Sequence, residues 1–260
     1  MRPKSALVMG AGGGGCGRAI ARRLAREGAA VVVCDLDELG AHETVRLIEH
    51  DGGKALLRGC DVRVASDVEE ALAFAARELG TLDTVINSAS APYRPQAPLD
   101  NWADTLATDL LGAMTATRAA IDVMTSGGAI VNMASTSALP HGRSHAGGSP
   151  AYDVAKAGVI RLTTMLGWLK RSGIRVNCFV PDWVATPEVQ SYVDGLTADE
   201  RAAMRVPSRL TTLGQVSDAV MVLVKDESLG GRVMVWWSND DAPKLIPFGD
   251  RGYGDLEDAS

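Results

Sequence analysis

Tyr152 and Lys156 are the two side chains of this sequence best suited to acid–base chemistry. They are four residues apart in a strongly periodic segment, so a helix would place both on one face. A phenol titrates at about 10, but a neighbouring ammonium favours the phenolate and lowers its pKa toward neutral pH. The hydroxyl of Ser135, shortly before, could hold a carbonyl oxygen while the phenol exchanges its proton. An isolated Tyr-x-x-x-Lys pair is usually a surface pair, so this interpretation depends on the rest of the chain.

A glycine-rich segment between Met9 and Ala21 follows the first apolar run of the chain. Glycines there allow a sharp turn and a close approach to a pyrophosphate, which the N-terminus of the next helix would bind. The pattern alone is a weak signal, because glycine-rich turns also occur for structural reasons. Here a strand precedes it, a helix follows it and an acidic residue comes later, which favours a dinucleotide-binding loop.

That acidic residue is Asp35, which closes the second apolar run. A carboxylate there can accept hydrogen bonds from both hydroxyls of an adenosine ribose, and it would repel a 2′-phosphate. The next residue is Leu36 rather than a phosphate-binding Arg, so the sequence favours NAD over NADP. Asp35 could also cap the following helix, and the two roles are compatible. Asp61 and Val62 end the next strand, where they could contact the adenine of the cofactor or simply form a turn.

The elements that must position these residues alternate along the first two-thirds of the chain. Continuous apolar strands between amphipathic helices predict a parallel sheet covered on both faces, which is an α/β fold of three αβα layers. With 260 residues, 46% of them hydrophobic, the chain fits a single domain over residues 1–260. The strand-like runs are Ala6–Met9, Ala30–Cys34, Thr84–Ile86, Ala129–Met133 and Ile174–Val180.

Composition narrows the class of function. A net charge of −6 without a basic block argues against nucleic acid or an anionic membrane as a partner. The four cysteines form no Cys-x-x-Cys pair, and no metal site is expected. The sequence shows no signal peptide, and its apolar runs are far shorter than the about 20 residues that a spanning helix needs. We therefore expect a cytoplasmic enzyme that acts on a small molecule.

The ordered set of motifs resembles the short-chain dehydrogenase/reductase family over roughly residues 4–237. This resemblance implies a Rossmann-type doubly wound sheet of about seven parallel strands, with Ser135, Tyr152 and Lys156 as the catalytic set. The matching pieces are the glycine loop, Asp35, Asp61, Val62, Asn87–Ser90, Ser135, Tyr152, Lys156 and Ile174–Pro187.

The same resemblance places further residues and suggests an assembly. It assigns Asn87 to the cofactor site, and it implies that Thr186 and the backbone at Val184 meet the nicotinamide end of the cofactor. Long helices such as Leu99–Met124 and Pro150–Lys170 commonly pack around two-fold axes in this family, which implies a homotetramer or dimer. Residues 187–213 are the expected substrate lid, and residues 239–260 are an acidic, irregular tail.

Three departures from the family pattern concern the cofactor and the proton. The glycine loop is one residue longer than usual, and Gly10, Gly15 and Gly17 take the three glycine roles. Ser90 replaces a glycine near the expected nicotinamide ribose, where its hydroxyl could add a contact or shift the cofactor. Asp109 replaces an Asn that is taken to hold a water chain from the Lys to solvent. Its negative charge would raise the Tyr pKa or pair with Lys156. Asp109 is therefore either a tolerated polar swap or the basis of an altered proton relay or a different reaction.

Other departures surround the expected substrate mouth. The loop Pro140–Pro150 is enlarged and either contacts the substrate or is solvated, and its two histidines, His141 and His145, have no nearby group to complete a metal site. Asp182 replaces a glycine after Pro181, which could change how the chain leaves the sheet. Trp236–Trp237 ends the last strand, either packing under the tail or a neighbouring subunit, or forming an aromatic wall for a planar substrate.

These features predict an NAD(H)-dependent oxidoreductase that interconverts a secondary alcohol and a ketone, with Tyr152 as the general acid/base. Lys156 would lower the Tyr pKa and hold the cofactor ribose, and Ser135 would fix the substrate oxygen. Asp109, Ser90 and the enlarged loop leave open a redox-neutral enzyme on the same scaffold, such as an epimerase or dehydratase. A non-catalytic NAD-binding protein is a third hypothesis, against which the intact Ser, Tyr and Lys argue.

Overall fold

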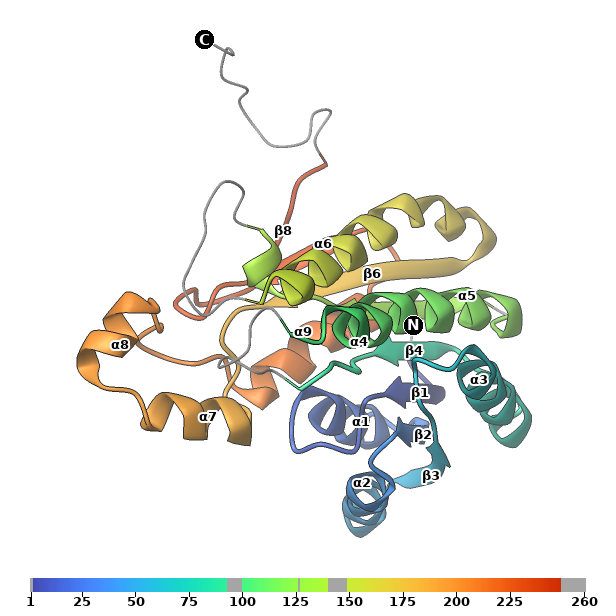
Figure 1. Ribbon diagram of the computed structural model, residues 1–260. Coiled ribbons are helices and arrows are strands. Elements are labelled where there is room, and N and C mark those ends of the chain that lie inside the picture. The colour runs from blue at the N-terminus through green and yellow to red at the C-terminus, as the bar shows by residue number, and fades with distance from the viewer. Residues whose placement is uncertain (1, 93–99, 126, 140–148, 249–260) are drawn as a thin grey trace.

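An eight-stranded sheet forms the centre of the molecule (Figure 1). The computed structural model describes residues 2–92, 100–125, 127–139 and 149–248. The strands lie in the order β3-β2-β1-β4-β5-β6-β7-β8, and every neighbouring pair is parallel except β7 and β8. Their bounds are β1 Ser5–Met9, β2 Ala30–Asp35, β3 Lys54–Gly59, β4 Thr84–Asn87, β5 Gly128–Met133, β6 Ile174–Pro181, β7 Val233–Trp236 and β8 Lys244–Leu245.

The predicted α/β fold with a doubly wound sheet is confirmed, and β1 to β7 are its parallel strands. The eighth strand departs from the prediction, which had only an irregular tail after residue 238. Lys244–Leu245 pairs antiparallel with Met234–Val235 of β7. An edge strand has unpaired backbone groups that bind any suitable segment, which explains why part of the tail joins the sheet. Residues 249–260 of that tail lie outside the described residues.

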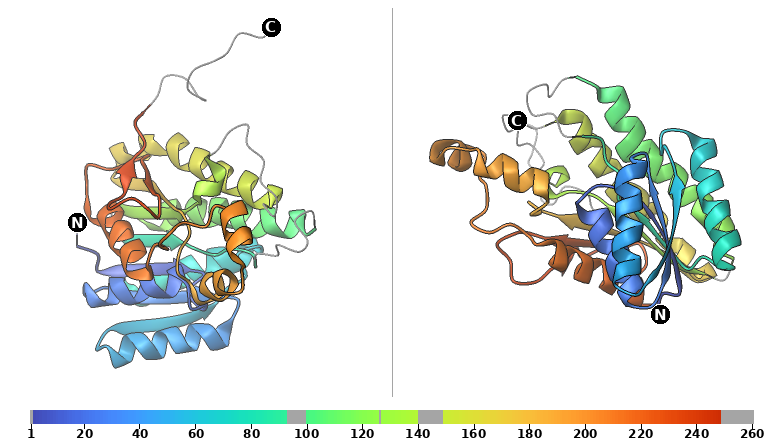
Figure 2. Two further views of the ribbon diagram at one scale, coloured as in Figure 1. Left: turned by 90° about the vertical axis from the view of Figure 1, so that its left-hand side faces the viewer. Right: turned by 90° about the horizontal axis from the view of Figure 1, so that it is seen from below.

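The central strands are buried along their whole length because helices cover both faces of the sheet. Every residue of β1, β4, β5, β6 and β7 is buried. Figure 2 shows the twisted sheet with helices on either side. Parallel strands buried in this way have continuous apolar sequences rather than alternating ones, and this is the pattern that the sequence contains.

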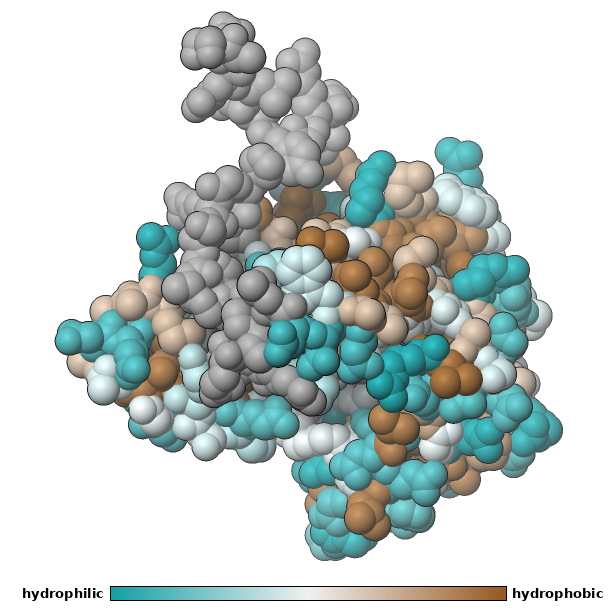
Figure 3. All heavy atoms as spheres, viewed as in Figure 1, coloured by the Kyte–Doolittle hydropathy of each residue, from teal (hydrophilic) through white to brown (hydrophobic). Residues whose placement is uncertain are grey.

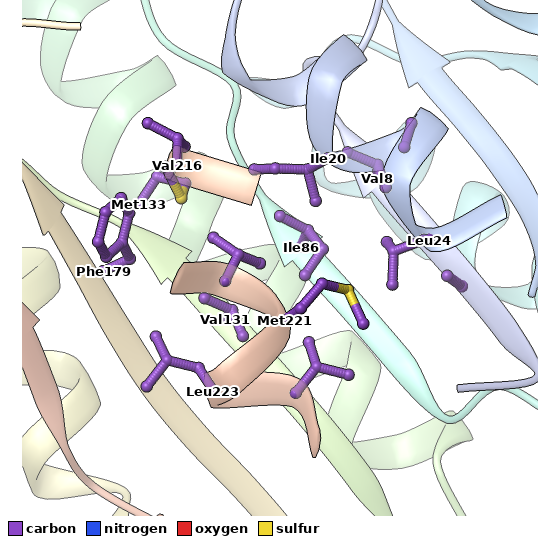
Figure 4. Close-up of a cluster of buried hydrophobic side chains, with 14 of the residues drawn as sticks. Val8, Ile20, Leu24, Ile86, Val131, Met133, Phe179, Val216, Met221 and Leu223 are labelled. Carbon is purple, nitrogen blue, oxygen red and sulfur yellow. The ribbon is translucent and has the colours of Figure 1, made fainter. Parts of the chain in front are cut away.

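One face of the sheet is covered by α1 Cys16–Arg26, α2 Glu38–His50 and α9 Leu213–Lys225. Ile20 and Leu24 of α1 lie four residues apart, and both are fully buried. Met221 of α9 points toward the same layer, over the side chains of the sheet (Figure 4). This packing fixes the N-terminal end of α1, and with it the glycine loop, at the edge of the sheet.

The other face is covered by α3 Ala65–Leu79, α5 Ala113–Val123 and α6 Pro150–Met165. The segment expected as one long helix, Leu99–Met124, is divided, and Leu99 lies outside the described residues. Its described part consists of α4 Trp102–Leu106, a π-helical segment η1 Ala107–Gly112, and α5. Likewise Pro150–Lys170 becomes α6 followed by a 3-10 segment, Gly167–Ser172. The π-helical turn widens the helix at Asp109, whose buried ion pair is described below.

A two-helix segment projects from the end of the sheet at which β6 terminates (Figure 1). It consists of α7 Pro187–Asp194 and α8 Ala198–Ala203, within the predicted lid, residues 187–213. Thr186 caps α7 by accepting a hydrogen bond from the Val189 N–H, and Thr197 forms a capping box with Glu200 at α8. Both helices therefore begin at residues fixed by their own side chains.

Some features are not found in the residues that the structure describes. No helix there is both long and apolar enough to cross a membrane. That part of the chain also holds no group of three or more His, Cys, Asp or Glu side chains placed to bind a metal ion. His141 and His145 lie outside it. All four cysteines are free thiols.

Candidate active site

The predicted site residues gather where β1, β4, β5 and β6 end. Strand order reverses between β1 and β4, since the chain adds β2 and β3 on one side of β1 and β4 on the other. In doubly wound sheets a crevice forms at the carboxyl ends of the strands on either side of this point. The glycine loop follows β1, Asn87 ends β4 and Ser135 follows β5, so the topology brings all three to this edge.

The glycine loop is packed so tightly that two of its positions admit no side chain. Gly10 has a φ of 79°, and a β-carbon there would overlap the backbone of Ala89. A β-carbon at Gly17 would overlap the carbonyl oxygen of Gly10. Gly15 occupies the cap position of α1 without a side-chain cap, so the first N–H groups of this 11-residue helix remain available to an anion. The loop therefore has the form of a pyrophosphate cradle.

Asp35 lies beside this loop and helps to fix it. Its Oδ2 accepts a hydrogen bond from the Gly12 N–H at 2.6 Å, and its Oδ1 accepts one from the Asp37 N–H at 2.9 Å. The alternative that Asp35 caps the following helix is wrong, because Asp37 is the cap residue of α2 and binds the Gly40 N–H. Gly12 of the glycine loop is thus held against the carboxylate that is expected to bind the adenosine ribose.

The guanidinium of Arg18, at the start of α1, donates hydrogen bonds to oxygen atoms of the glycine loop and of α2. Arg18 donates hydrogen bonds to the carbonyl oxygens of Gly12 and Gly40 and to the Thr44 hydroxyl. Its Nη2–Gly40 contact is 3.0 Å and its Nε–Thr44 contact is 2.8 Å. Arg18 therefore links the glycine loop to α2.

The two residues expected at the adenine end have partners of their own. Asp61 forms a bidentate ion pair with Arg63, whose Nε and Nη2 lie 2.9 and 2.6 Å from its two carboxylate oxygens. Hydrogen bonding to Arg63 lowers the pKa of Asp61, which keeps it charged. Arg63 also binds Asp104 at 2.7 Å. Val62 packs against Gly112, so it ties this turn to the π-helical segment.

Asn87 lies at the base of the crevice and is buried. Its Nδ2 donates to Asn132 Oδ1 at 2.7 Å and to the Thr117 hydroxyl at 3.1 Å, in a polar network that continues to Thr163. Its Oδ1 has no hydrogen-bond partner among the described residues. A buried acceptor without a partner is costly, and a bound cofactor group or water that donates to it would remove that cost.

The catalytic set predicted from the sequence comes together around the start of α6. Pro150 is the first residue of this helix, which places Tyr152 in its first turn and Lys156 in its second, on one face. The Lys156 Nζ lies 5.2 Å from the centre of the Tyr152 ring. Ser135, which caps the short 3-10 turn Thr136–Ala138, forms a hydrogen bond that acts to lower the pKa of Tyr152. The three side chains therefore form one cluster.

Two of the departures from the family pattern, Ser90 and Asp109, meet at this cluster. Asp109 Oδ1 lies 2.9 Å from Lys156 Nζ, and both side chains are almost completely buried. The Ser90 hydroxyl donates to the same Oδ1 at 2.5 Å, and the Ala91 N–H donates to Oδ2 at 2.9 Å. The predicted pairing of Asp109 with Lys156 is thus confirmed. The Ser90 hydroxyl is directed at Asp109, and its expected position near the cofactor ribose stays a prediction.

The pKa of Tyr152 is raised, whereas an isolated Tyr–Lys pair predicts a lowered value. Burial raises the pKa of Tyr152, and the charge of Asp109 raises it further, which together outweigh the opposing effects of Lys156 and Ser135. Burial alone would lower the pKa of Lys156, but the charges of Asp109 and of the phenolate raise it above its ordinary value. The pKa of each group therefore lies above its ordinary value, which is itself well above neutral pH.

Val184 and Thr186 lie where the chain leaves β6 toward the lid. Val184 is buried and forms a parallel bridge with Thr211. A β-carbon at Gly15 would lie 3.4 Å from the Thr186 methyl group, so the residue just before the lid faces the N-terminal end of α1. Thr186 therefore lies next to the glycine loop, and its expected contact with the nicotinamide end of the cofactor stays a prediction.

Sequence reasoning missed two residues of the site. Cys16 lies between Gly15 and Gly17. Burial raises the pKa of its thiol to about 11, and the nearby positive charge of Lys156 acts in the opposite direction. Asp182 accepts hydrogen bonds from the Thr136 hydroxyl at 2.8 Å and the Ser238 N–H at 3.2 Å, and so ties the Ser135 turn to β6. The replacement of a glycine by Asp182 was visible in the sequence, but its partners were not.

The aromatic pair at the end of β7 and the lid complete the surroundings. Trp236 is buried and donates its Nε1–H to the Asp240 carbonyl at 3.1 Å, which confirms packing under the tail, while Trp237 is 43% exposed. A cavity of about 570 Å³ lies within the segment expected to be the substrate lid. Residues of the lid and of the segment before α9 line it, among them Gln190, Val193, Arg201, Val206 and Leu210.

A doubly wound sheet whose switch point carries a glycine loop is a Rossmann-type α/β protein, the class that binds dinucleotides at this place. A family model described as enoyl-(acyl carrier protein) reductase matches residues 10–232. Together with the relatives described next, this match shows that the chain belongs to the short-chain dehydrogenase/reductase family.

The relatives are enzymes of about the same length. Human (3R)-3-hydroxyacyl-CoA dehydrogenase is 35% identical over 242 residues, which covers 88% of this chain and 91% of the relative. Cis-4-hydroxycyclohexanecarboxylate dehydrogenase of Sinomonas cyclohexanicum is 37% identical over 232 residues, covering 85% and 89%. The crystal structure of actinorhodin polyketide ketoreductase with NADPH has a TM-score of 0.80 at 31% identity, covering 91% of this chain and 96% of that one.

Proposed function

We propose that this protein is a nicotinamide-dependent oxidoreductase that interconverts a secondary alcohol and a ketone, with a preference for NAD(H). The observation that carries the proposal is the cluster of Ser135, Tyr152 and Lys156 beside the glycine loop, with the Lys156 Nζ 5.2 Å from the Tyr152 ring centre. The relatives named above as dehydrogenases of hydroxy compounds and as a ketoreductase support the same reaction class.

The chain offers a place for each part of such a cofactor. The uncapped N-terminus of α1 would bind the pyrophosphate, and the unpartnered Asn87 Oδ1 would accept a hydrogen bond near the nicotinamide end. Lys156 directs two of its three N–H groups at Asp109 and at the Met133 carbonyl, which leaves one for a ribose hydroxyl. The bound nicotinamide would supply or accept the hydride, chemistry that no side chain provides.

The preference for NAD rests on the adenosine end. Asp35 would accept hydrogen bonds from the ribose hydroxyls through its remaining lone pairs, and its charge would repel a 2′-phosphate. Arg18, which could otherwise attract that phosphate, is held by the carbonyl oxygens of Gly12 and Gly40. Asp61 and Val62 would border the adenine. The related ketoreductase was crystallised with NADPH, so calorimetric titration of this protein with NADH and with NADPH tests the preference directly.

The side chains would handle the proton. Ser135 would donate a hydrogen bond to the substrate oxygen, and Tyr152 would give its phenolic proton to that oxygen in reduction or remove it in oxidation. Lys156 would stabilise the phenolate that forms, and Asp109 would hold the ammonium in place. The cavity of about 570 Å³ in the expected lid segment, with Ala185 and Thr212 in its lining, would take the remainder of the substrate. Val184 and Thr186 would meet the nicotinamide end of the cofactor.

Nicotinamide absorbance tests the proposal. We expect purified protein to reduce NAD⁺ with some member of a panel of secondary alcohols that includes 3-hydroxyacyl thioesters and hydroxycyclohexanecarboxylates, and to oxidise NADH with the matching ketones. Tyr152→Phe should bind NADH normally and lose turnover by about 10²-fold or more. Turnover in Tyr152→Phe equal to that of the wild type would refute the role of the phenol. Tight NADH binding with no redox turnover across the panel would favour the redox-neutral alternative.

The assembly and location are part of the proposal. The outward faces of η1, α5 and α6 expose large apolar side chains, and Figure 3 shows such residues gathered over α6. They suit the interface of a homodimer or homotetramer, the assembly proposed here, and include Leu111, Met114, Val154 and Met165. The four free thiols fit the reducing cytoplasm, which is the proposed location.

A further inference from the structure

Asp109 is held by three donors in the interior of the protein. Lys156 Nζ and the Ser90 hydroxyl share its Oδ1 at 2.9 and 2.5 Å, and the Ala91 N–H binds its Oδ2 at 2.9 Å. The Asp109 side chain has no exposed surface. A carboxylate with a cation and two hydrogen-bond donors is stabilised in its charged form and fixed in direction.

The backbone beneath Asp109 is equally fixed. Asp109 lies in the π-helical segment η1, where the wider turn brings its side chain toward α6. On one side of η1, Leu110 fills the space above Gly158 of α6, where a β-carbon would come within 2.7 Å of it. On the other side, Gly112 packs against Val62, which leaves no room for a side chain. Since both sides are closely packed, Asp109 cannot move away from Lys156 without a rearrangement of the helix.

The groups that face the Tyr152 phenol come from several elements. Lys156 faces it from α6, Asp109 from η1, Cys16 from α1 and Ser135 from the turn after β5, while Cys178 of β6 faces Lys156. The two thiols are neutral at neutral pH, since burial raises the pKa of Cys16 to about 11 and that of Cys178 to about 12. The charges near the phenol are therefore one ammonium and one carboxylate, which largely cancel.

We propose that Ser90 and Asp109 are a positioning pair that holds Lys156 in a buried ion pair, so that Tyr152 keeps its proton through neutral pH and serves ketone reduction in preference to alcohol oxidation. The inference rests on the proposed function. In reduction the proton moves from the phenol oxygen to the substrate oxygen, and the phenolate regains a proton from solvent. In oxidation the phenol must first be ionised, which the nearby carboxylate opposes.

The sign of the pH dependence follows from this arrangement. A group that holds its proton to higher pH remains a competent acid over a wider range, so reduction stays level through neutral pH and falls only in alkali. Oxidation requires the phenolate, so its rate rises with pH until the phenol is ionised. Removing the carboxylate charge moves both transitions to lower pH.

The decisive variant is Asp109→Asn, which keeps the shape of the side chain and removes its charge. At a fixed pH on the rising limb, with substrates and cofactor saturating, we expect the ratio of kcat for oxidation to kcat for reduction to be about tenfold higher in this variant than in the wild type. Asp122→Asn, which removes an exposed carboxylate from α5, is the matched control and should leave both profiles unchanged. Identical profiles in Asp109→Asn and wild type would overturn the inference.

Ser90→Ala tests the second member of the pair. It should alter the profile when Asp109 is present and have no effect in the Asp109→Asn background, because its hydroxyl acts through the carboxylate. Equal effects of Ser90→Ala in both backgrounds would show that Ser90 acts on substrate or cofactor directly.

A measurement without substrate separates this inference from the proposed function. Phenolate absorbance during an alkaline titration, taken as wild type minus Tyr152→Phe, reports the ionisation of Tyr152 alone. We expect no Tyr152 phenolate through neutral pH in the wild type, and ionisation at lower pH in Ser90→Ala/Asp109→Asn. Phenolate already present at neutral pH in the wild type would overturn the inference even if the enzyme oxidises alcohols. A protein without any redox activity that titrates as expected would instead refute the proposed function.

Discussion

Gly17→Ala is the substitution whose effect on the cofactor site can be worked out most directly from the structure. A β-carbon at Gly17 would overlap the Gly10 carbonyl oxygen, which is backbone and cannot rotate away. The loop or the start of α1 must therefore shift, and an overpacked site of this kind costs about 1–3 kcal/mol. If this free energy destabilises the complex with NADH, the Kd for NADH rises about 5- to 150-fold. If it falls on folding, the Tm decreases by about 2–12 °C.

Gly13→Ala is the matched control in the same loop. Gly13 is exposed and has no positive φ, and a β-carbon added to it would have no atom within 4 Å. We expect this variant to keep the wild-type Tm and to bind NADH within about threefold of the wild type. Calorimetric titration with NADH and thermal unfolding of the three proteins measure both quantities. A Gly17→Ala protein that matches the wild type in both, or a Gly13→Ala protein as damaged as Gly17→Ala, would refute the reasoning.

Three further predictions concern charge and assembly. Asp109→Asn should lower the free energy of unfolding by about 3–5 kcal/mol in urea denaturation, because it leaves the buried Lys156 without its counter-ion; an unchanged midpoint would contradict the buried pair. Asp35→Asn keeps an acceptor for the Gly12 N–H and removes the charge, so the ratio of NADPH to NADH affinity in calorimetry should rise about tenfold or more, and a constant ratio would contradict the proposed role of Asp35. Val154→Asp or Met165→Asp, at exposed apolar positions of α6, should reduce the mass measured by light scattering to that of a monomer, whereas an unchanged mass would place the interface elsewhere.

The sheet could be predicted from the sequence because its signal is local. Runs such as Ala30–Cys34 and Ile174–Val180 are apolar nearly throughout, which is typical of strands covered on both faces, and each became a strand of the sheet. β8 could not be predicted in this way, since Lys244–Leu245 has no strand-like composition and pairs only because the edge of β7 is available.

The part of the candidate site that lies within a single local motif could be predicted from the sequence. Tyr152 and Lys156 share a helix face at a fixed spacing, and the structure brings them together as expected. The partnership between Ser90 and Asp109 was not predictable, because the two residues lie on different elements and their contact depends on a π-helical turn. The Tyr–Lys pair alone predicted a lowered pKa for Tyr152, whereas its pKa is raised, because burial, a property of the folded chain, outweighs the effect of Lys156.

The most direct test of the proposed function is a crystal structure of the protein with NADH. We expect the pyrophosphate at the N-terminus of α1, the adenosine ribose on Asp35, and the nicotinamide beside the Tyr152 hydroxyl. A dinucleotide bound elsewhere, or one whose nicotinamide is turned away from Tyr152, would contradict the roles proposed for these residues.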